Sequence, residues 1–537
     1  MSRISRRSFF GVAGAAAAVV AAGSVTGPAA TRPGGFDDTA VRPARVPQTH
    51  EEHRAVVTGS GFGGGVSALR LTQAGVPVLM LERGRRWPTG PNADTFPSAT
   101  APDRRMVWHG SAPELFGRTM PVDPYVGLIE AVTGQNMTVL CAAGLGGGSL
   151  VYQGMTLQPE RSVFETHFPA GLDYGLLERE YFPRVARMLS IATAPDALIE
   201  TPNYAAPRAF AAQARRAGLP VEKIPMPIDW QYALDEVDGK MAPAYTSGAA
   251  FGINNGGKHT VDLTYVAQAE ATGLLDVRTQ HQVTDVERGS DGRWIVRVDR
   301  IDETGRILAH LVVTTDALIM AAGTMNTTRL LMRAQAHGTV PDLPDGLGAD
   351  WGSNADRIYV WTDPAHGFGA DQGGPVVYVS KNWDDPHTAH TVIQASVPAL
   401  PLDTASTILV GYGASEGRGR FVYDHAADLA MLHWPHEGDH VLQTGHIEPT
   451  VRKIVGPDAL LTDTNALMPS TWHPLGGAAM DRVCDLSGRV LGQPGLYVLD
   501  GALMPGNTAA CNPSMTIAAL AEHGIDRIIA EDVGTVF

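Results

Sequence analysis

Residues 56–65 of the chain read Val56-Val57-Thr58-Gly59-Ser60-Gly61-Phe62-Gly63-Gly64-Gly65. A short apolar run, 55–57, leads into the glycines, and a helix-compatible run, 66–74, follows them and ends at Gly75. A second apolar run, 76–81, then leads to Glu82. This succession of strand, glycine turn, helix, strand and acid is typical of a βαβ unit that binds a dinucleotide.

Each conserved element of such a unit has a physical task. Gly59 allows the tight turn, Gly61 lets the backbone approach a pyrophosphate, and Gly64 lets the helix pack closely on the strand. The free N–H groups at the start of the helix attract the phosphate charge. Glu82 follows at about the spacing, roughly 20 residues, at which an acid accepts hydrogen bonds from the adenosine ribose. The stretch therefore predicts a nucleotide site.

The length and composition indicate a large globular protein. A chain of 537 residues exceeds one ordinary hydrophobic core, so we expect two or more domains. Hydrophobic residues make up 44% and charged residues 18%, which excludes a disordered chain. The net charge of −15 argues against nucleic acid and anionic membranes as partners. The three cysteines are too few for a disulfide framework.

The N-terminus carries the pattern of an export signal. Two arginines stand in the run Ser5-Arg6-Arg7-Ser8-Phe9-Phe10, and an Ala/Val-rich stretch, 11–23, follows that is too short to span a bilayer. This pattern predicts a twin-arginine signal over 1–30 and a linker over 31–49. We therefore expect a protein that is secreted, periplasmic or associated with the cell wall.

The sequence His436-Glu437-Gly438-Asp439-His440 matches the zinc motif HExxH. That motif binds zinc only from within a helix, where both histidines share one face. Here Pro435 precedes the motif, and glycine and aspartate lie inside it, which indicates a loop or a helix start. We expect no metal site.

Beyond Glu82 the chain alternates between two kinds of pattern. The glycine-rich run 142–152 is suited to close approach of a flat ligand. The segments 274–288 and 293–298 predict strands, and 317–336 repeats the order strand, glycine, helix around Gly323. In contrast, the alternating runs near 376–379 and 407–412 predict a separate antiparallel sheet.

The C-terminal hundred residues carry three further motifs. One is Thr471-Trp472-His473-Pro474-Leu475-Gly476-Gly477-Ala478, which holds a histidine against a turn. The second is a strand ending in Asp500-Gly501, and the third is Asn512-Pro513 before a helix over 517–529. Asparagine before proline is a helix-entry signal, and the helix start could face a cofactor.

Together these motifs resemble the glucose–methanol–choline (GMC) oxidoreductases, and within them the actinobacterial FAD-dependent cholesterol oxidases. The resemblance runs from about residue 50 to the C-terminus, with five motifs in the family's order. They are Gly59 to Gly64 with Glu82, the loop Gly144 to Leu150, Ala322-Gly323, His473 to Gly477, and Asp500-Gly501 with Asn512-Pro513.

The resemblance implies a mixed α/β (α+β) fold with two domains. A Rossmann-like FAD-binding domain would be assembled from the discontinuous segments 50–87, 260–348 and 488–537. A substrate-binding domain with a mostly antiparallel sheet would comprise 88–259 and 349–487.

The resemblance also implies the site and its partners. His473 and Asn512 would be catalytic, the histidine binding or deprotonating the substrate hydroxyl and the asparagine contacting flavin and substrate oxygen. Imidazole is suited to that proton near neutral pH. Expected partners are a small hydrophobic, sterol-like alcohol, dioxygen and, transiently, a lipid surface. Non-covalent FAD would be held by Gly59, Gly61, Gly64, Glu82, Gly144, Gly148, Ser149, Met155, Val283, Gly323, Asp500, Gly501, Asn512 and Met515.

The chain departs from the cholesterol oxidase pattern in two places. The glutamate that isomerises the steroid product would align with Ala395, and strand alternation turns the adjacent Gln394 to the opposite face. An asparagine and a glycine after the glycine-rich loop are replaced by Tyr152 and Gln153. Alcohol oxidation is therefore expected, while isomerisation and sterol specificity are in doubt. The alternatives are an oxidase or dehydrogenase of another bulky alcohol that uses a different acceptor, and an idle flavin- or sterol-binding protein.

Overall fold

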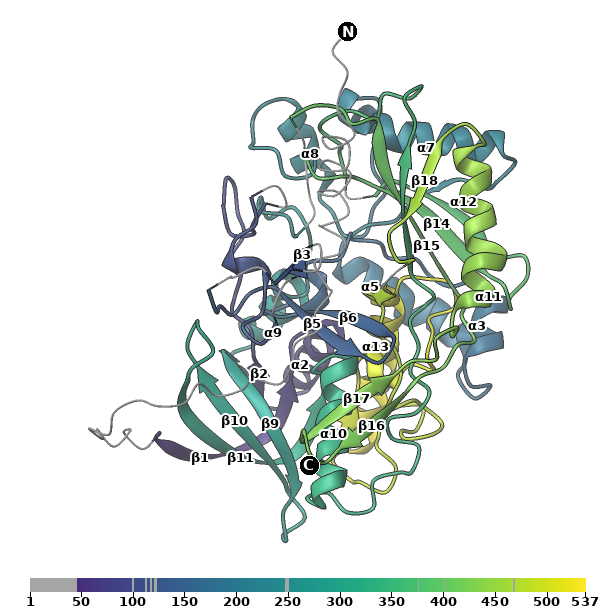
Figure 1. The fold of residues 1–537 in the computed structure, drawn as a ribbon. Helices are drawn as coiled ribbons and strands as arrows, with labels where there is room; N and C mark the ends of the chain where they lie inside the picture. Colours follow the sequence, from purple (N-terminus) through teal and green to yellow (C-terminus); the bar gives the residue numbers. More distant parts are fainter. Residues whose placement is uncertain are drawn as a thin grey trace, which may run out of the picture.

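The computed structural model shows a mixed α/β fold (Figure 1). It describes residues 46–98, 101–111, 114–115, 118–119, 123–246, 251–374, 376–399, 401–466 and 469–537. The predicted export signal and residues 31–45 of the predicted linker lie outside these ranges. No helix among the described residues is long and apolar enough to cross a membrane.

The first sheet contains the glycine turn. Its strand order is β8-β2-β1-β11-β10-β9, and β20 pairs with the C-terminal end of β11. The contacts among β8, β2, β1, β11 and β20 are parallel, whereas β9, β10 and β11 form an antiparallel meander. The strands are β1 (Gln48–Thr58), β2 (Val78–Glu82), β8 (Leu275–Thr279), β9 (His281–Arg288), β10 (Trp294–Ile301), β11 (Ile307–Met320) and β20 (Leu496–Val498).

The βαβ unit forms where the sequence predicts it, with two changes of boundary. The first strand begins at Gln48, inside the segment expected to be linker, because its N-terminal half pairs with the long strand β11. The helix α2 (Phe62–Gln73) begins four residues earlier than the apolar pattern indicated, since the glycines themselves form its first turn. Gly75 follows the helix with a φ of +82°, as expected of a glycine that ends a helix.

The second sheet is wholly antiparallel and lies in the upper half of Figure 1. Its order is β18-β12-β15-β14-β13-β7. The strands are β7 (Glu222–Lys223), β12 (Arg357–Thr362), β13 (Tyr378–Asn382), β14 (His390–Ala395), β15 (Ser406–Gly413) and β18 (Leu460–Asp463). This is the separate antiparallel sheet that the alternating runs predicted; the exact domain boundaries stay a prediction.

The two faces of the second sheet have different neighbours. Tyr359, Val392 and Leu409 pack against the helices α7 (Ala205–Arg216) and α12 (Glu448–Val455) in one apolar cluster. Because side chains alternate along a strand, the residues on either side of these three point away from the helices. That opposite face is free to line a cavity.

Helix α13 (Pro513–Glu531), the last helix of the chain, packs on α2, the helix of the βαβ unit. Its Glu522 is fully buried and accepts from Arg70 Nε at 2.6 Å, Arg184 Nη1 at 3.1 Å and Tyr265 Oη at 3.0 Å. A buried carboxylate is tolerated only when it is paired in this way. The network therefore locks α13 in place, and with it the orientation of its N-terminus.

The remaining elements lie outside these two sheets. They are η1 (Arg104–Met106), β3 (Glu114–Leu115), β4 (Arg118–Thr119), β5 (Ile129–Gly134), β6 (Met137–Ala142), η2 (Gly147–Ser149), α3 (Arg161–His167), α4 (Tyr174–Leu176), η3 (Leu177–Tyr181), α5 (Phe182–Met188), α6 (Asp196–Ile199), η4 (Pro202–Tyr204), α8 (Trp230–Val237), η5 (Asp262–Val266), α9 (Ala267–Ala271), α10 (Thr324–His337), β16 (Arg420–Asp424), β17 (Leu429–His433), α11 (His440–Leu442), η6 (Gln443–Ile447), β19 (Ser470–Thr471) and η7 (Gly501–Leu503).

Candidate active site

One cavity of about 810 Å³ connects the glycine turn with the second sheet. At one end it is lined by the residues that follow the carboxyl ends of the parallel strands β1, β2 and β11 and of β20, where open α/β sheets bind ligands. At the other end it is lined by the helix-free face of the second sheet and by His473. A ligand held at the first end can therefore lie against a second ligand at the other.

The glycine turn has the geometry that the sequence predicted. Gly59 has a φ of +87°, and a Cβ there would lie 2.3 Å from the carbonyl oxygen of Ala321. The N-cap of α2 is Gly61, which makes no side-chain cap, so the first N–H groups of the helix stay available beside the cavity. These features fit an anionic phosphate group.

Glu82 lines the cavity and is almost fully buried. Its carboxylate accepts from Ser60 Oγ at 2.6 Å and from the backbone N–H of Gly84 at 2.8 Å. A carboxylate has about four lone-pair sites, so two remain for ribose hydroxyls. Ser60 Oγ also accepts from the N–H of Gly146 at 3.1 Å, which ties the glycine turn to the glycine-rich loop.

Ten of the residues predicted to hold the cofactor line this cavity, and four do not. Gly64 lies behind the turn, where a Cβ would be 2.2 Å from the carbonyl oxygen of Gly59, so the close packing of helix on turn requires glycine there. Gly144 packs against the indole of Trp87, and Ser149 Oγ donates to the carbonyl of Gly146 at 2.7 Å.

Met515 is the fourth residue that does not line the cavity. It is buried in the core behind the first turn of α13, and Ile517 lines the cavity in its stead. Helical periodicity explains the exchange, because residues two apart on a helix face different sides.

Asp500 connects three segments at the cavity end that adjoins the glycine turn, which we call the nucleotide end. It accepts from the N–H of Gly323 at 2.8 Å, from Thr327 Oγ1 at 2.5 Å and from the N–H of Ala502 at 2.8 Å. Burial raises the pKa of Asp500 to about 6, although these hydrogen bonds act in the opposite direction. The carboxyl therefore holds the start of α10 against the end of β20, beside the cavity.

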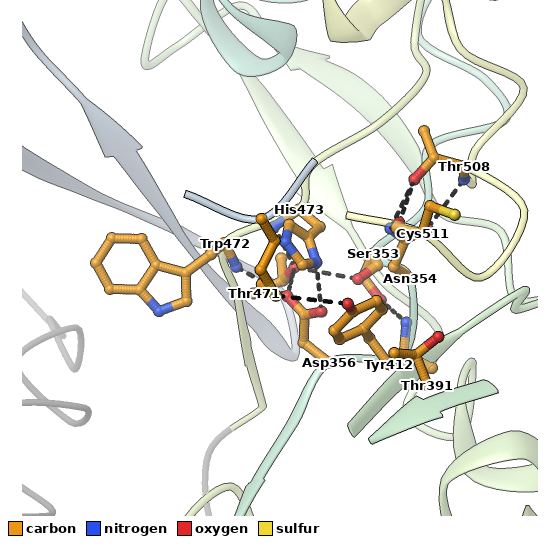
Figure 2. A network of polar contacts seen from close by, with 12 residues as sticks. Ser353, Asn354, Asp356, Thr391, Tyr412, Thr471, Trp472, His473, Thr508 and Cys511 are labelled. Atoms are coloured by element: carbon orange, nitrogen blue, oxygen red, sulfur yellow. Dashed lines mark hydrogen bonds and ion pairs between the residues drawn. The ribbon is translucent and has the colours of Figure 1, made fainter. Parts of the chain in front are cut away.

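His473 stands at the other end and is paired with an aspartate that the sequence did not single out. The imidazole Nδ1 lies 2.7 Å from Asp356 Oδ1, although the two residues are 117 positions apart (Figure 2). The ring of Tyr412 meets the imidazole edge to face at 5.5 Å. His473 and Asp356 both line the cavity.

Asp356 is itself held from the loop that carries the histidine. Its Oδ2 accepts from Thr471 Oγ1 at 2.7 Å and from the N–H of Trp472 at 3.0 Å. The same threonine oxygen accepts from the N–H of His473 at 2.8 Å. The turn of the histidine motif and the start of β12 are therefore one hydrogen-bonded unit (Figure 2).

The cavity wall formed by the second sheet is apolar. Ile393 and Ala395 on β14 and Ile408 and Val410 on β15 line it together with Ile358 on β12. Cross-strand pairing sets Val410 beside both Ile393 and Ile358. A wall of this kind is suited to a bulky apolar substrate.

The structure shows which way the side chains point at Ala395, the position aligned with the isomerising glutamate, and at the adjacent Gln394. Ala395 lines the cavity, whereas Gln394 is buried on the opposite side of the strand and donates to Thr407 Oγ1 at 2.9 Å. The alternation expected from the sequence is therefore present. Asp356, bound to His473, is the lining carboxylate beside the histidine; the other lining carboxylates are Glu82, Glu130, Asp428 and Asp500.

Asn512 is placed differently from a free catalytic amide. It is the N-cap of α13 but makes no side-chain cap; its Nδ2 donates to the carbonyl of Met155 at 2.5 Å and to Ser514 Oγ at 2.7 Å. Both amide protons are thus used. A hydrogen bond to a substrate oxygen would require one of them to be exchanged, so its catalytic role stays a prediction.

Tyr152 also faces the cavity, and within the described residues its buried hydroxyl has no hydrogen-bond partner. Lys258 Nζ lies 4.5 Å from its ring and donates to the carbonyl oxygens of Leu150 and Tyr152. Burial lowers the pKa of Lys258 to about 7. The lysine therefore holds the end of the glycine-rich loop in place.

The zinc-like motif does not lie within a helix. Residues 436–439 form turns, and His440 only begins the short helix α11, so the two histidines do not share a helix face. Within the described ranges, no three His, Cys, Asp or Glu side chains gather as a metal ion would require.

Comparison with known proteins identifies similarity to one family. A family model described as GMC oxidoreductase matches residues 124–340, a second with that description matches residues 423–521, and together they cover more than half of the chain. A cholesterol oxidase of Mycobacterium tuberculosis (strain ATCC 25618 / H37Rv) is 26% identical over 548 residues, covering 88% of this chain and 90% of that protein. A cholesterol oxidase of Acinetobacter baumannii is 24% identical, covering 89% and 94%.

Two solved structures share the fold. Pyridoxine 4-oxidase from Mesorbium loti superposes with a TM-score of 0.60 at 17% identity, covering 88% of this chain and 99% of that one. A fungal aryl-alcohol oxidase superposes with a TM-score of 0.61 at 16% identity, covering 90% and 100%. The fold is therefore common to these proteins, while their substrates differ.

Proposed function

Because the chain belongs to the GMC oxidoreductase family and is an oxidoreductase acting on alcohols, we propose that it oxidises a bulky, sterol-like secondary alcohol to the ketone with bound FAD. Dioxygen is the proposed final acceptor, which gives hydrogen peroxide. The observation that carries this proposal is the single cavity that joins the glycine turn to His473 along an apolar wall.

The residues at the nucleotide end fit FAD held without a covalent bond. The uncapped start of α2 is suited to the pyrophosphate, and Glu82 has acceptor sites left for the ribose. The N-terminus of α13, with Asn512 and Ser514 lining the cavity, directs its positive end at the same space. When bound, FAD supplies the hydride acceptor.

At the substrate end the chain provides binding and proton transfer. The apolar wall would bind the hydrocarbon body and exclude water, leaving the hydroxyl next to His473. Removal of a hydride from the alcohol carbon requires that the O–H proton leave, and the imidazole is the group placed to receive it. Isomerisation of a steroid product lacks a free carboxylate, since Ala395 stands at the required place.

The proposal is tested by incubating the purified flavoprotein with 3-hydroxysteroids and other bulky alcohols while flavin absorbance and peroxide are followed. We expect the yellow colour to bleach anaerobically with a bulky secondary alcohol and peroxide to form in air. Bleaching without peroxide would indicate a different acceptor. A flavin that no alcohol reduces would indicate a binding protein and contradict the proposal.

Export is a separate proposal that rests on Ser5-Arg6-Arg7-Ser8-Phe9-Phe10 and the apolar stretch after it. The twin-arginine route carries folded proteins, which suits a chain that needs its cofactor before export. Replacing both Arg6 and Arg7 by lysine should retain the protein in the cytoplasm, as measured by fractionation. Unchanged export would exclude this route.

A further inference from the structure

We propose that Asp356 is a positioning residue that fixes the tautomer of His473 and strengthens Nε2 as the acceptor of the alcohol proton. The two side chains then act as one unit, which neither residue's sequence neighbourhood indicates. This inference rests on the proposed function, because it concerns the proton that leaves when the alcohol is oxidised.

The hydrogen-bond inventory decides which imidazole nitrogen carries the proton. Asp356 Oδ2 already accepts from Thr471 Oγ1 and from the N–H of Trp472. Its Oδ1 lies 2.7 Å from His473 Nδ1, and an ionised carboxylate has no proton to donate. Nδ1 must therefore be the donor, and in the neutral ring Nε2 is left as a bare acceptor.

The environment keeps this arrangement in place. The side chain of Asp356 is 6% exposed and that of His473 is 15% exposed, so water competes little for the hydrogen bond between them. Tyr412 meets the imidazole edge to face, and the backbone N–H of His473 is bound by Thr471. Rotation of the ring would break the hydrogen bond to Asp356 and leave Oδ1 of this buried carboxylate without a donor.

The pair has a clear task in the reaction. In the proposed reaction the alcohol O–H bond would break and its proton would go to Nε2 of His473, while bound FAD would supply the acceptor for the hydride of the alcohol carbon, so that the C=O bond forms. The imidazolium that results lies against the negative charge of Asp356, which stabilises it. Asp356 itself touches His473 and not the reacting atoms, so its effect acts through the histidine.

Other titratable groups lie close enough to influence this pair. Tyr412 lies beside the imidazole, and burial, with the nearby charge of Asp356, raises its pKa well above the usual value, so it stays neutral. Ser353 Oγ, on the loop that leads to Asp356, donates to Asp439 at 2.5 Å, and Ser415 Oγ, which follows β15, donates to the same carboxylate at 2.5 Å. A test of Asp356 therefore needs a variant that changes charge without changing size.

Asp356→Asn meets that need, and its amide must make hydrogen bonds different from those of the carboxylate. In one orientation the new amide oxygen faces Trp472 N–H and the NH2 group faces His473 Nδ1, so Nδ1 must accept a hydrogen bond. The ring proton of His473 then moves to Nε2, which can no longer accept the alcohol proton. If its NH2 group faces Trp472, two donors oppose each other. The first arrangement is therefore expected, as the same exchange inverts the tautomer in other His–Asp pairs.

The variant Asp299→Asn is a matched control. His310 Nδ1 lies 2.6 Å from Asp299 Oδ1 on β10 and β11, away from the cavity lining. The control removes the same charge from a similar pair. It should leave flavin content, flavin reduction and the signals of His473 unchanged.

The experiment uses FAD-loaded protein with 15N-labelled histidine. The His473 signals are identified by their absence in His473→Gln, and flavin reduction by the best alcohol of the panel is followed by stopped flow against pH. We expect Nδ1–H and a bare Nε2 in the unaltered protein. In Asp356→Asn we expect Nε2–H and flavin reduction slower by about 10²–10⁴-fold, with FAD content and melting temperature retained.

Three outcomes would overturn the inference. One is Nε2–H in the unaltered protein, which needs no substrate to be seen. The second is an unchanged tautomer in Asp356→Asn. The third is Asp356→Asn that reduces flavin within about threefold of the unaltered rate at every pH. If no alcohol reduces the flavin at all, the proposed function fails, while the NMR measurement still decides whether Asp356 sets the tautomer.

Discussion

The two ends of the cavity are built in different ways. The nucleotide end consists largely of backbone: Gly59 turns the chain, the start of α2 offers N–H groups, and Glu82 is the main side chain. The substrate end consists of side chains from β12, β14 and β15, with His473 and Asp356 at its edge. Backbone geometry tolerates little substitution, whereas an array of side chains can be altered one residue at a time.

Because of this difference, we expect substitutions to affect cofactor retention separately from the chemistry of the reaction. Changes at the nucleotide end should weaken cofactor retention with little effect on the loaded enzyme. Changes at the substrate end should alter chemistry or product while the cofactor stays bound. The following four variants test that separation, from the largest expected effect to the smallest.

His473→Gln should retain FAD but slow flavin reduction by about 10²–10⁴-fold, because the amide cannot accept the alcohol proton. Stopped-flow reduction by an accepted alcohol measures the rate, and the flavin spectrum of the purified variant measures retention. Normal reduction would give the histidine a structural role. Loss of FAD would show that the two ends are not independent.

Glu82→Gln should weaken FAD binding by roughly ten- to a hundredfold, or about 1.5–3 kcal/mol, because one charge-assisted hydrogen bond to the ribose is lost. Turnover of the loaded fraction should change little, since Glu82 lies at the far end from His473. FAD dissociation is measured by fluorescence. Glu52→Gln, on the exposed part of β1, is the control and should bind FAD normally; equal affinities would remove Glu82 from the site.

Asp439→Asn should change how stability depends on pH. Burial raises the pKa of Asp439 from 3.8 to about 6, so between these values the folded protein holds a proton that the unfolded chain releases. The free energy of unfolding therefore falls as pH rises through this window, by up to about 1.4 kcal/mol per pH unit for one proton.

The measurement is denaturant unfolding of Asp439→Asn and of the unaltered protein between pH 4 and 7. The variant should lack this part of the slope and keep its FAD. Asp500→Asn is the counterpart at the nucleotide end, since the pKa of Asp500 is also raised to about 6. It should lose the slope and FAD together. Identical slopes in all three proteins would contradict the assignment.

Ala395→Glu should have the smallest effect on oxidation, within about fivefold in peroxide formation, yet alter the product of a 5-ene-3-hydroxysteroid if one is accepted. The new carboxylate would face the cavity, where burial raises its pKa toward that of a proton shuttle. The unaltered protein should release the 5-ene-3-one, and the variant should form some 4-ene-3-one.

Gln394→Glu is the control for this change, because residue 394 faces away from the cavity. A timed chromatogram against the rate of isomerisation in buffer measures both variants. Rapid formation of the conjugated ketone by the unaltered protein would show that another base acts at the substrate end. The same gain in both variants would show that the face of the strand does not matter.

Much of the nucleotide end could be predicted from the sequence because its parts are close together in the chain. Strand, turn, helix and acid lie within residues 48–82, and the backbone of a glycine turn depends on its own residues. The resemblance added Asp500 and Gly323, which the structure joins by a 2.8 Å hydrogen bond. The alternation that separates Ala395 from Gln394 was equally local, since a strand alone determines it.

Tertiary structure decided what the sequence could not. Four residues belong to the expected motifs but do not line the cavity: Gly64, Gly144, Ser149 and Met515. Whether a residue lines a cavity depends on which neighbours cover it. The pairing of His473 with Asp356 was invisible for the same reason: an aspartate 117 positions away has no local pattern that marks it. Contacts between distant segments arise only when the sheets pack. The sequence by itself therefore determined the geometry of the glycine turn and singled out His473, and only the fold brought Asp356 to that histidine.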